Sequence, residues 1–186
     1  MVSGKGFIKF SLLALLLLSA GMSVAQDELR RTFFKDADAA RAAADALDAR
    51  LLSPRAYSAG ADDYEDAEEG LERGRNIEYV RRKTSDAEAN FKQAAETAEL
   101  AKTVLAQVMK SRQDAANARA PELAREVWDK AQREFGNAIR YLERGDLKNA
   151  QKNDIEATTF YRDAELIAIK AQYLGETRQL LSEADR

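Results

Sequence analysis

The chain has 186 residues, of which 33 % are charged and 45 % hydrophobic, with a formal net charge of −3 and only two prolines. It contains no histidine and no cysteine, which excludes disulfide bonds, thiol nucleophiles and the commonest general base, and removes the usual transition-metal ligands. The low proline content favours an all-helical chain, and the acidic charge balance argues against nucleic-acid binding.

Residues 1–25 have the pattern of a secretory signal peptide. Lys5 and Lys9 supply positive charge, an apolar run covers Phe10–Leu18, and Ser23–Ala25 offers small residues at a cleavage site. The apolar run is shorter than the roughly 20 residues that a membrane span needs. We expect export to the periplasm or cell envelope and no transmembrane span after cleavage, with an uncleaved anchor as the alternative. Cleavage removes two of the 29 basic residues and none of the 32 acidic ones.

Prolines and glycines mark where helices begin and end in the rest of the chain. Ser53 is placed as an N-cap before Pro54 at the first helical position, and Pro121 repeats the proline start. Gly74 and Gly145 stand where a helix C-terminus needs a residue with positive φ. These signals predict two short helices, each ending at a glycine turn.

Polar caps follow both glycine turns. Asn76 and Asp146 are suited to capping the next helix. No segment has the pattern of a strand. The sequence therefore predicts about five helices, at 27–51, 54–73, 76–117, 121–143 and 146–184.

The chain repeats itself with a spacing of 69 to 71 residues. The run DALDAR at 45–50 matches DAANAR at 114–119, and LERG occurs at 71–74 and again at 142–145. A ladder of alanines and aromatics also recurs: Ala87 with Ala157, Phe91 with Tyr161, Ala94 with Ala164, Ala98 with Ala168, Ala101 with Ala171. A repeat of this kind is typical of helical arrays.

The predicted helix 76–117 has the most regular apolar seam, with alternating steps of three and four residues. At 1.5 Å per residue it would be on the order of 60 Å long, about twice the length of 54–73 or 121–143. We therefore expect an elongated, all-α array of tandem three-helix modules that share this continuous helix, as in spectrin-like rods or αα-hairpin arrays. The expected modules are 26–96 and 97–167, followed by 168–186 as the start of an incomplete third module of a longer protein.

Several segments carry a family resemblance. The segments are LLSPRAY, the LERG turns, ARAPELAREVWDKAQREF and GDLKNAQKNDIEATTFYRDAELIAIKA, all within residues 30–175. They are similar to the alanine-rich helical domain of unknown function of bacterial envelope proteins. That domain is often found ahead of an OmpA-like peptidoglycan-binding domain. The resemblance implies an exported helical part that spaces or presents such a domain. This sequence contains no OmpA-like domain, so no peptidoglycan-contacting residue can be carried over.

Basic residues surround both LERG turns and form two candidate anion-contact patches. The first patch is Arg73, Arg75, Arg81, Arg82 and Lys83, and the second is Arg140, Arg144, Lys148 and Lys152. Such patches suit lipid headgroups, lipopolysaccharide phosphates or glycan carboxylates. The alternative is that these cations complement helix dipoles and pair with neighbouring acids. We expect two separate patches.

The acidic and aromatic residues have plainer explanations. Helix 54–73 carries a dense acidic cluster, but a straight helix cannot wrap oxygens around a cation, so a solvated face is favoured over a metal or catalytic site. The aromatics fall at seam positions, which favours core packing. Adjacent Phe33 and Phe34 cannot both face one seam, so one of them is expected to be partly exposed.

Two functional classes remain. The first is a non-enzymatic helical spacer or scaffold of the cell envelope, without cofactor or metal, whose partners are proteins or peptidoglycan-associated envelope components. The second is a periplasmic holdase chaperone or a module that binds anionic envelope components. A holdase needs an exposed apolar surface, whereas this chain commits its aromatics to internal seams. The oligomeric state stays open.

Overall fold

The computed structural model describes residues 28–185, and all of the regular structure in this range is helical. The predicted signal peptide lies outside the described residues. A helix covering residues 28–46 is followed by seven others: α2 (Ala49–Leu52), α3 (Pro54–Glu72), α4 (Ile77–Val104), α5 (Ala106–Asn117), α6 (Ala120–Leu123), α7 (Arg125–Glu143) and α8 (Leu147–Ala184). The all-helical class is therefore confirmed. The count of about five is not, because short breaks divide three of the expected helices.

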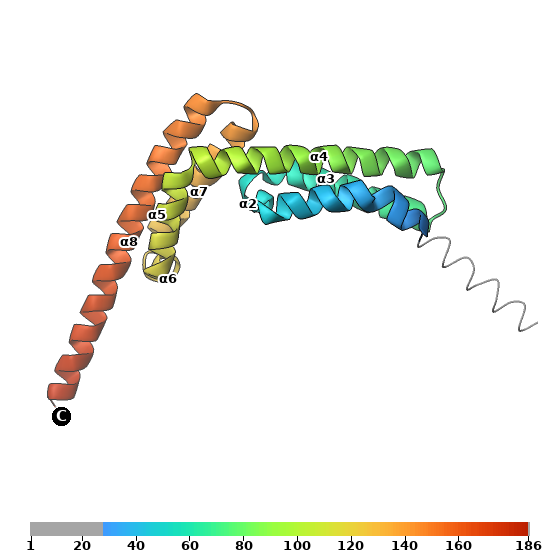
Figure 1. The fold of residues 1–186 in the computed structure, drawn as a ribbon. Coiled ribbons are helices and arrows are strands. Elements are labelled where there is room, and N and C mark those ends of the chain that lie inside the picture. The colour runs from blue at the N-terminus through green and yellow to red at the C-terminus, as the bar shows by residue number, and fades with distance from the viewer. Residues whose placement is uncertain (1–27, 186) are drawn as a thin grey trace, which may run out of the picture.

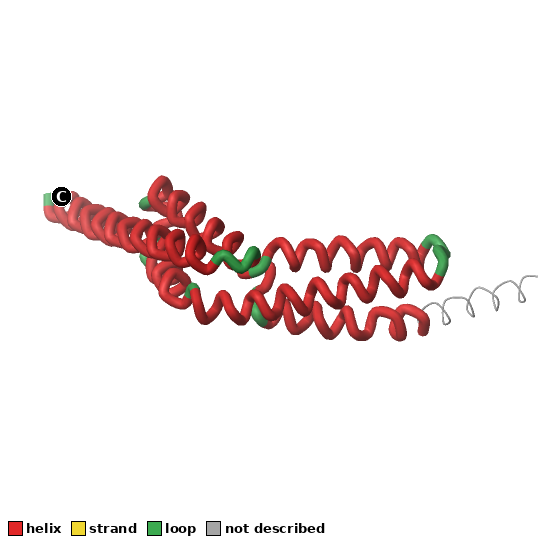
Figure 2. The backbone as a smooth tube through the Cα atoms, turned by 90° about the horizontal axis from the view of Figure 1, so that it is seen from above, coloured by secondary structure: helices red, strands yellow, loops and turns green. Residues whose placement is uncertain are grey.

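The helices form two groups that meet at an angle. Helix 28–46, α3 and α4 run side by side, whereas α5, α7 and α8 run across that direction (Figures 1 and 2). Within the first group α3 packs on α4, and within the second α7 and α5 pack on α8. The four-residue helices α2 and α6 take corresponding places, because α2 contacts α3 and α4 while α6 contacts α7 and α8.

The sequence repeat recurs in the backbone geometry. Gly74 and Gly145 have φ values of +62° and +74°, which confirms the glycine turns. Asp48 and Arg119, 71 residues apart, also have positive φ, at 57° and 61°. Aspartate tolerates this conformation better than arginine does, so the second site carries more strain. The same chain reversal is thus built twice, although the second copy uses a less suitable residue.

The caps after the glycine turns also agree with the sequence. The Asn76 side chain accepts a hydrogen bond from the Glu78 backbone N–H at 2.8 Å, and Asp146 accepts one from Asn149 at 3.1 Å. Each cap satisfies one of the backbone donors that a helix start leaves unpaired. Both long helices therefore begin as predicted.

The expected continuous helix 76–117 is wrong, because it breaks at Leu105. The backbone of Leu105 has φ −103° and ψ 18°, outside the helical range. Hydrogen bonding continues through the break, since the Leu105 N–H donates to the Ala101 carbonyl at 2.8 Å and its carbonyl accepts from Met109 at 3.1 Å. The break is thus a kink whose two sides contact different helices, α4 packing on α3 and α5 on α8. The two helix groups therefore meet at an angle rather than in line (Figure 1).

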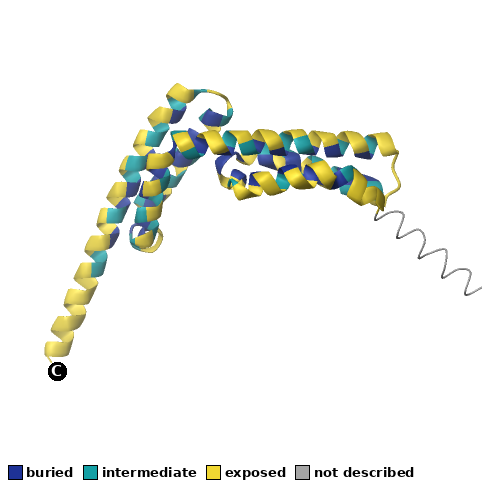
Figure 3. Ribbon diagram, viewed as in Figure 1, coloured by how far each residue is buried: buried dark blue, intermediate teal, exposed yellow. Residues whose placement is uncertain are grey.

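The predicted seam forms the core. Buried residues line the sides where helices face each other, and the outward sides are exposed (Figure 3). The six seam aromatics are all buried: Tyr57, Tyr64, Phe91, Trp128, Phe135 and Tyr161. Phe34 is fully buried, while Phe33 is only partly buried, as expected for neighbouring residues on a helix.

Candidate functional site

The first basic patch lies at the turn between α3 and α4, and two of its members form ion pairs. The Arg73 guanidinium lies 2.5 Å from the Glu69 carboxylate, and that of Arg81 lies 3.4 Å from Glu78. All four side chains are largely exposed. Exposed pairs of this kind contribute only about 0.3–0.5 kcal/mol. Both arginines are thus partly neutralised, but they remain accessible.

Arg75 and Arg82 are held differently, by the ring of Tyr79. The Arg75 guanidinium carbon lies 4.8 Å from the ring centroid and that of Arg82 lies 5.5 Å from it. The ring itself lies against Gly70, where an added Cβ would come within 2.9 Å of it. Among residues 28–185 neither arginine pairs with a carboxylate. Tyr79 therefore presents two guanidinium groups with unneutralised charge, a role that its position in the sequence does not reveal.

Lys83 points into the protein rather than outward. Its ammonium lies 2.8 Å from both Asp63 and Asp66 of α3, and its side chain is only 21 % exposed. Hydrogen bonds to Asp63 and then to Asp66 raise the pKa of Lys83 above its usual range. Asp63 also accepts a hydrogen bond from Asn90 at 2.9 Å. Lys83 thus links α4 to α3, and only the arginines of this candidate patch are left to contact an anion.

The second basic patch surrounds the turn between α7 and α8. Arg140 donates a hydrogen bond to Asn137, and Lys152 lies 4.0 Å from Glu156, at the limit of an ion pair. Arg144 and Lys148 are exposed and have no carboxylate partner in the described part of the chain. The two turns lie in separate places, the first at the free end of α3 and α4 and the second beside the junction of the two helix groups (Figure 1).

Glu143, in the second LERG turn, caps a helix in the other group. One of its carboxylate oxygens accepts hydrogen bonds from the Arg55 and Ala56 backbone N–H groups of α3, at 2.9 and 3.3 Å, and from the Ser53 hydroxyl at 3.0 Å. Ser53 is the N-cap residue of α3 by position, but its side chain does not bond to its own helix. Glu143 takes that role and also places a negative charge at the helix N-terminus, where it is stabilising.

A polar cavity of about 300 Å³ lies beside this contact. It is bounded by the start of α3, the middle of α4 and the end of α7, and its lining residues are Ser53, Arg55, Ala56, Ala59, Asn90, Gln93, Thr97 and Glu143. The lining offers hydroxyl, amide and carboxylate groups suited to hydrogen bonding. Two of these groups, the Ser53 hydroxyl and the Glu143 carboxylate, already bond to each other.

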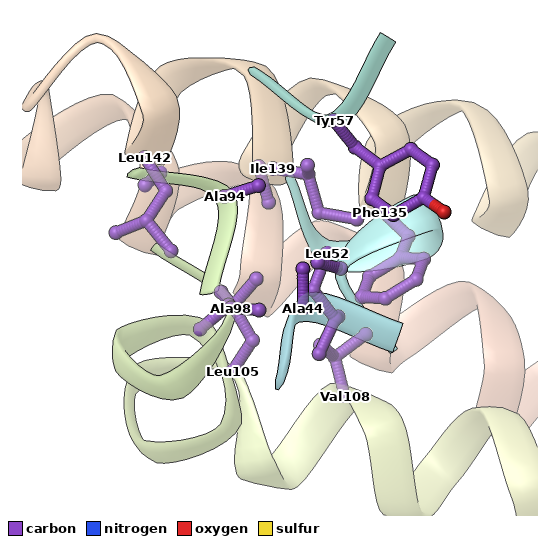
Figure 4. Packing of buried hydrophobic residues seen from close by; sticks show 14 of the residues in the cluster. Ala44, Leu52, Tyr57, Ala94, Ala98, Leu105, Val108, Phe135, Ile139 and Leu142 are labelled. Atoms are coloured by element: carbon purple, nitrogen blue, oxygen red, sulfur yellow. The ribbon is translucent and has the colours of Figure 1, made fainter. Parts of the chain in front are cut away.

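Apolar packing accompanies the Glu143 contact. Ile139 and Leu142 of α7 are buried and belong to the same apolar cluster as Ala94, Ala98 and Leu105 (Figure 4). The end of α7 therefore joins the two helix groups through both a capping carboxylate and a hydrophobic contact. The repeated LERG is visible in the sequence. The sequence alone does not show that the glutamate of its second copy contacts the other helix group.

The acidic cluster of α3 is divided among several partners. Asp63 and Asp66 contact Lys83, Glu69 contacts Arg73, and Glu68 contacts Arg30 at 2.5 Å. The cluster also borders a shallow depression, lined by Asp62, Glu65, Asp66, Glu68, Glu69 and Glu72. Over residues 28–185, no three acidic side chains are arranged to hold a metal ion. The cluster acts mainly as a source of ion pairs between helices.

Glu143→Ala is expected to lower the free energy of unfolding by about 2 kcal/mol, because it removes the cap of α3 and leaves the buried Ser53 hydroxyl unpaired. Glu143→Gln should cost less, since its amide oxygen still accepts hydrogen bonds. Urea denaturation followed by circular dichroism measures both. Glu72 is the matched control, because it occupies the same place in the first LERG and is exposed. Equal effects of Glu143→Ala and Glu72→Ala would contradict the capping role.

Within the described range, no helix has the length and apolar character needed to cross a membrane. No protein-family model matches the chain, and neither a curated protein nor a solved structure gives a match.

Proposed function

We propose that the chain is a non-enzymatic helical spacer or scaffold of the bacterial cell envelope. The observation that carries the proposal is the repeated unit, in which a helix, a four-residue helix, a 19-residue helix and a long helix follow one another twice. Such repeats build extended objects of defined geometry, in which each unit contacts only its neighbours. They suit a protein that holds other parts at a set distance.

The finer architecture that we propose is a tandem array of two three-helix modules. Helix 28–46, α3 and α4 are the three helices of the first module, with the four-residue α2 between the first two, and α5, α7 and α8 are those of the second, with α6 in the same place. The boundary between the two modules then falls at the Leu105 kink, between α4 and α5, rather than at the expected 96/97, which lies inside α4. The expected boundary at 167/168 lies inside α8. The kink at Leu105 turns one module relative to the other, and the Glu143 cap fixes that turn. A spacer of this kind sets an angle as well as a length.

The envelope location rests on the sequence. The signal-peptide pattern of residues 1–25 and the resemblance to the helical domain found ahead of OmpA-like domains both support it. We propose protein partners or peptidoglycan-associated envelope components. The Tyr79 side chain with Arg75 and Arg82 is the surface we assign to an anionic envelope component, since these guanidinium groups have no carboxylate partner among the described residues.

A holdase chaperone is the second candidate, and one observation favours it. The second half of α8 exposes large apolar side chains, among them Leu166, Tyr173, Leu174 and Leu180. An exposed apolar surface is what a holdase needs to shield client segments. The surface lies along a single helix, however, and two cavities that border α3 are polar or acidic in lining.

An aggregation assay discriminates between the two candidates. An unfolded outer-membrane protein is diluted from urea in the presence of an equimolar amount of the chain, and light scattering is followed. A spacer leaves aggregation unchanged, and small-angle scattering extrapolated to zero concentration then gives a bent, elongated particle. Suppression of aggregation would favour the holdase and remove the spacer as the main function. Compact scattering would contradict the proposed array.

A further inference from the structure

The outward side of α8 carries a row of apolar residues that nothing in the described chain covers. This outer stripe consists of Ile155, Leu166, Ile169, Tyr173 and Leu180, which are 37–67 % exposed. They are separated by 11, 3, 4 and 7 residues, close to whole numbers of helical turns, so they share one side. The opposite side of α8 is buried against α5 and α7. Figure 3 shows the outer side and the whole lower part of α8 as exposed.

The repeat supplies an internal comparison for this stripe. Seventy residues earlier, the same outward positions on α4 and α5 are polar in every case, and all of them are exposed: Ser85, Glu96, Glu99, Thr103 and Lys110. The fold therefore does not require apolar residues at these positions. In the first half of the chain the outward side has the composition of a solvated surface, and in α8 it has the composition of a contact surface.

The charges along α8 indicate what would cover the stripe. Lys152 and Arg162 precede the apolar centre on the outward side, and Glu176 and Glu183 follow it. Arg162 is 46 % exposed, although its guanidinium also lies 3.4 Å from Glu165 and 3.8 Å from Asp114 of α5. Glu165 and Lys170, of opposite sign, flank the apolar centre, so the outward side is basic at its start and acidic at its end. A second identical helix laid antiparallel brings the opposite charges together, whereas a parallel one brings like charges together.

We propose that a second copy of this chain pairs with the first along the outer stripe, with the two α8 helices antiparallel. A register that places Leu166 opposite Ile169 of the second copy puts the two apolar centres in contact. The same register places Ile155 opposite Leu180 of the second copy, so all four apolar positions are matched by one two-fold axis. Closed two-fold symmetry is the commonest arrangement of protein dimers.

The same register also gives partners to charged residues on the outward side. Lys152 lies opposite Glu183 of the second copy, and Arg162 lies opposite Tyr173 of the second copy, where a guanidinium and an aromatic ring attract each other. Steps of three and four residues along the stripe suit the packing of two helices with slight supercoiling. Ile167, Leu174 and Leu181 extend the apolar surface along one flank.

Cysteine cross-linking tests both the pairing and its direction, because the chain has no cysteine of its own. The variants Ile155→Cys and Leu180→Cys are purified separately and oxidised alone or as a mixture. The antiparallel pair predicts a disulfide-linked dimer in the mixture and little in either variant alone, since each position faces the other. Dimers in each variant alone would overturn the antiparallel arrangement. No dimer in the mixture would overturn the pairing itself.

Sedimentation equilibrium of the full chain measures the pairing without cross-linking. The double variant L166E/I169E places on α8 the residues that the first half of the chain has at 96 and 99. It should raise the dimer dissociation constant by about tenfold or more, because it places two negative charges in the apolar centre. Leu100→Glu, an exposed leucine on α4, is the matched control and should leave dimerisation unchanged.

Circular dichroism checks that the double variant folds, and Tyr173→Thr, the milder exchange to the residue at 103, provides a second variant. A wild-type chain that sediments as a monomer at every concentration contradicts the proposal. So does a stripe that binds lipid vesicles or unfolded protein in place of a second copy.

Discussion

Phe91→Ala is expected to lower the free energy of unfolding by about 3–5 kcal/mol, because it deletes a fully buried ring and leaves a cavity. Phe91 packs edge-on against Tyr57 and Tyr64, with ring centroids 5.3 and 6.5 Å apart. It also lies against Gly60, where an added Cβ would come within 2.9 Å of the ring. These neighbours come from α3 and cannot follow the shortened side chain. Urea denaturation monitored by far-ultraviolet circular dichroism measures the loss.

The repeat provides conservative controls for this prediction. Tyr161 occupies the equivalent place in the second half of the chain, and its hydroxyl bonds to Gln132 at 2.9 Å. The residue equivalent to Gln132 is Ala61, which cannot accept that hydrogen bond. Phe91→Tyr should therefore cost about 1–3 kcal/mol by burying an unpaired hydroxyl. A loss below 1 kcal/mol for Phe91→Ala would contradict the close packing of α3 and α4.

Features governed by short stretches of chain were predictable from the sequence. Gly74 and Gly145 end helices because they reach positive φ at little cost, and Asn76 and Asp146 then cap the next helices. The buried ladder was predictable as well, because its spacing alone decides which residues share a helix face. Nothing in these inferences depends on contacts between distant segments.

Features governed by tertiary contacts were not predictable. The break at Leu105 contains neither proline nor glycine, and the apolar seam runs through it. Only the different packing partners of α4 and α5 explain it. Asp48 and Arg119 reverse the chain without a glycine signal. Local propensity therefore predicts helices in the right places. It does not predict the breaks that divide three of the expected helices into two helices each.

The candidate site divides in the same way. The nine basic residues are predicted from their position around the turns, but the sequence cannot show which way a long side chain points. Lys83 turns inward to Asp63 and Asp66, whereas Arg75 and Arg82 are held outward on Tyr79. Glu143 was not singled out, since its partners on α3 are nearly 90 residues away in the sequence.

Leu105→Ala is expected to cost about 2–5 kcal/mol of unfolding free energy, because Leu105 is fully buried at the kink between α4 and α5. It belongs to the cluster that also contains Leu52 of α2 and Leu142 of α7 (Figure 4). Truncation therefore opens a cavity where the two helix groups meet, rather than inside one of them. Urea denaturation measures the total loss, and small-angle scattering measures whether the angle between the groups becomes variable.

Leu100→Ala is the matched control for the kink, because Leu100 is on the same helix but 46 % exposed, so its truncation should change stability by no more than about 0.5 kcal/mol. If the junction fixes the angle between the two helix groups, Leu105→Ala should broaden the distribution of particle shapes that fits the scattering profile. Leu100→Ala should leave that distribution unchanged. A large loss of stability with an unchanged profile would mean that the Glu143 cap alone holds the angle. A loss of unfolding free energy as small as that of the control would mean that the two helix groups fold independently. This junction would then not fix the angle between them, and the spacer role would lose that support.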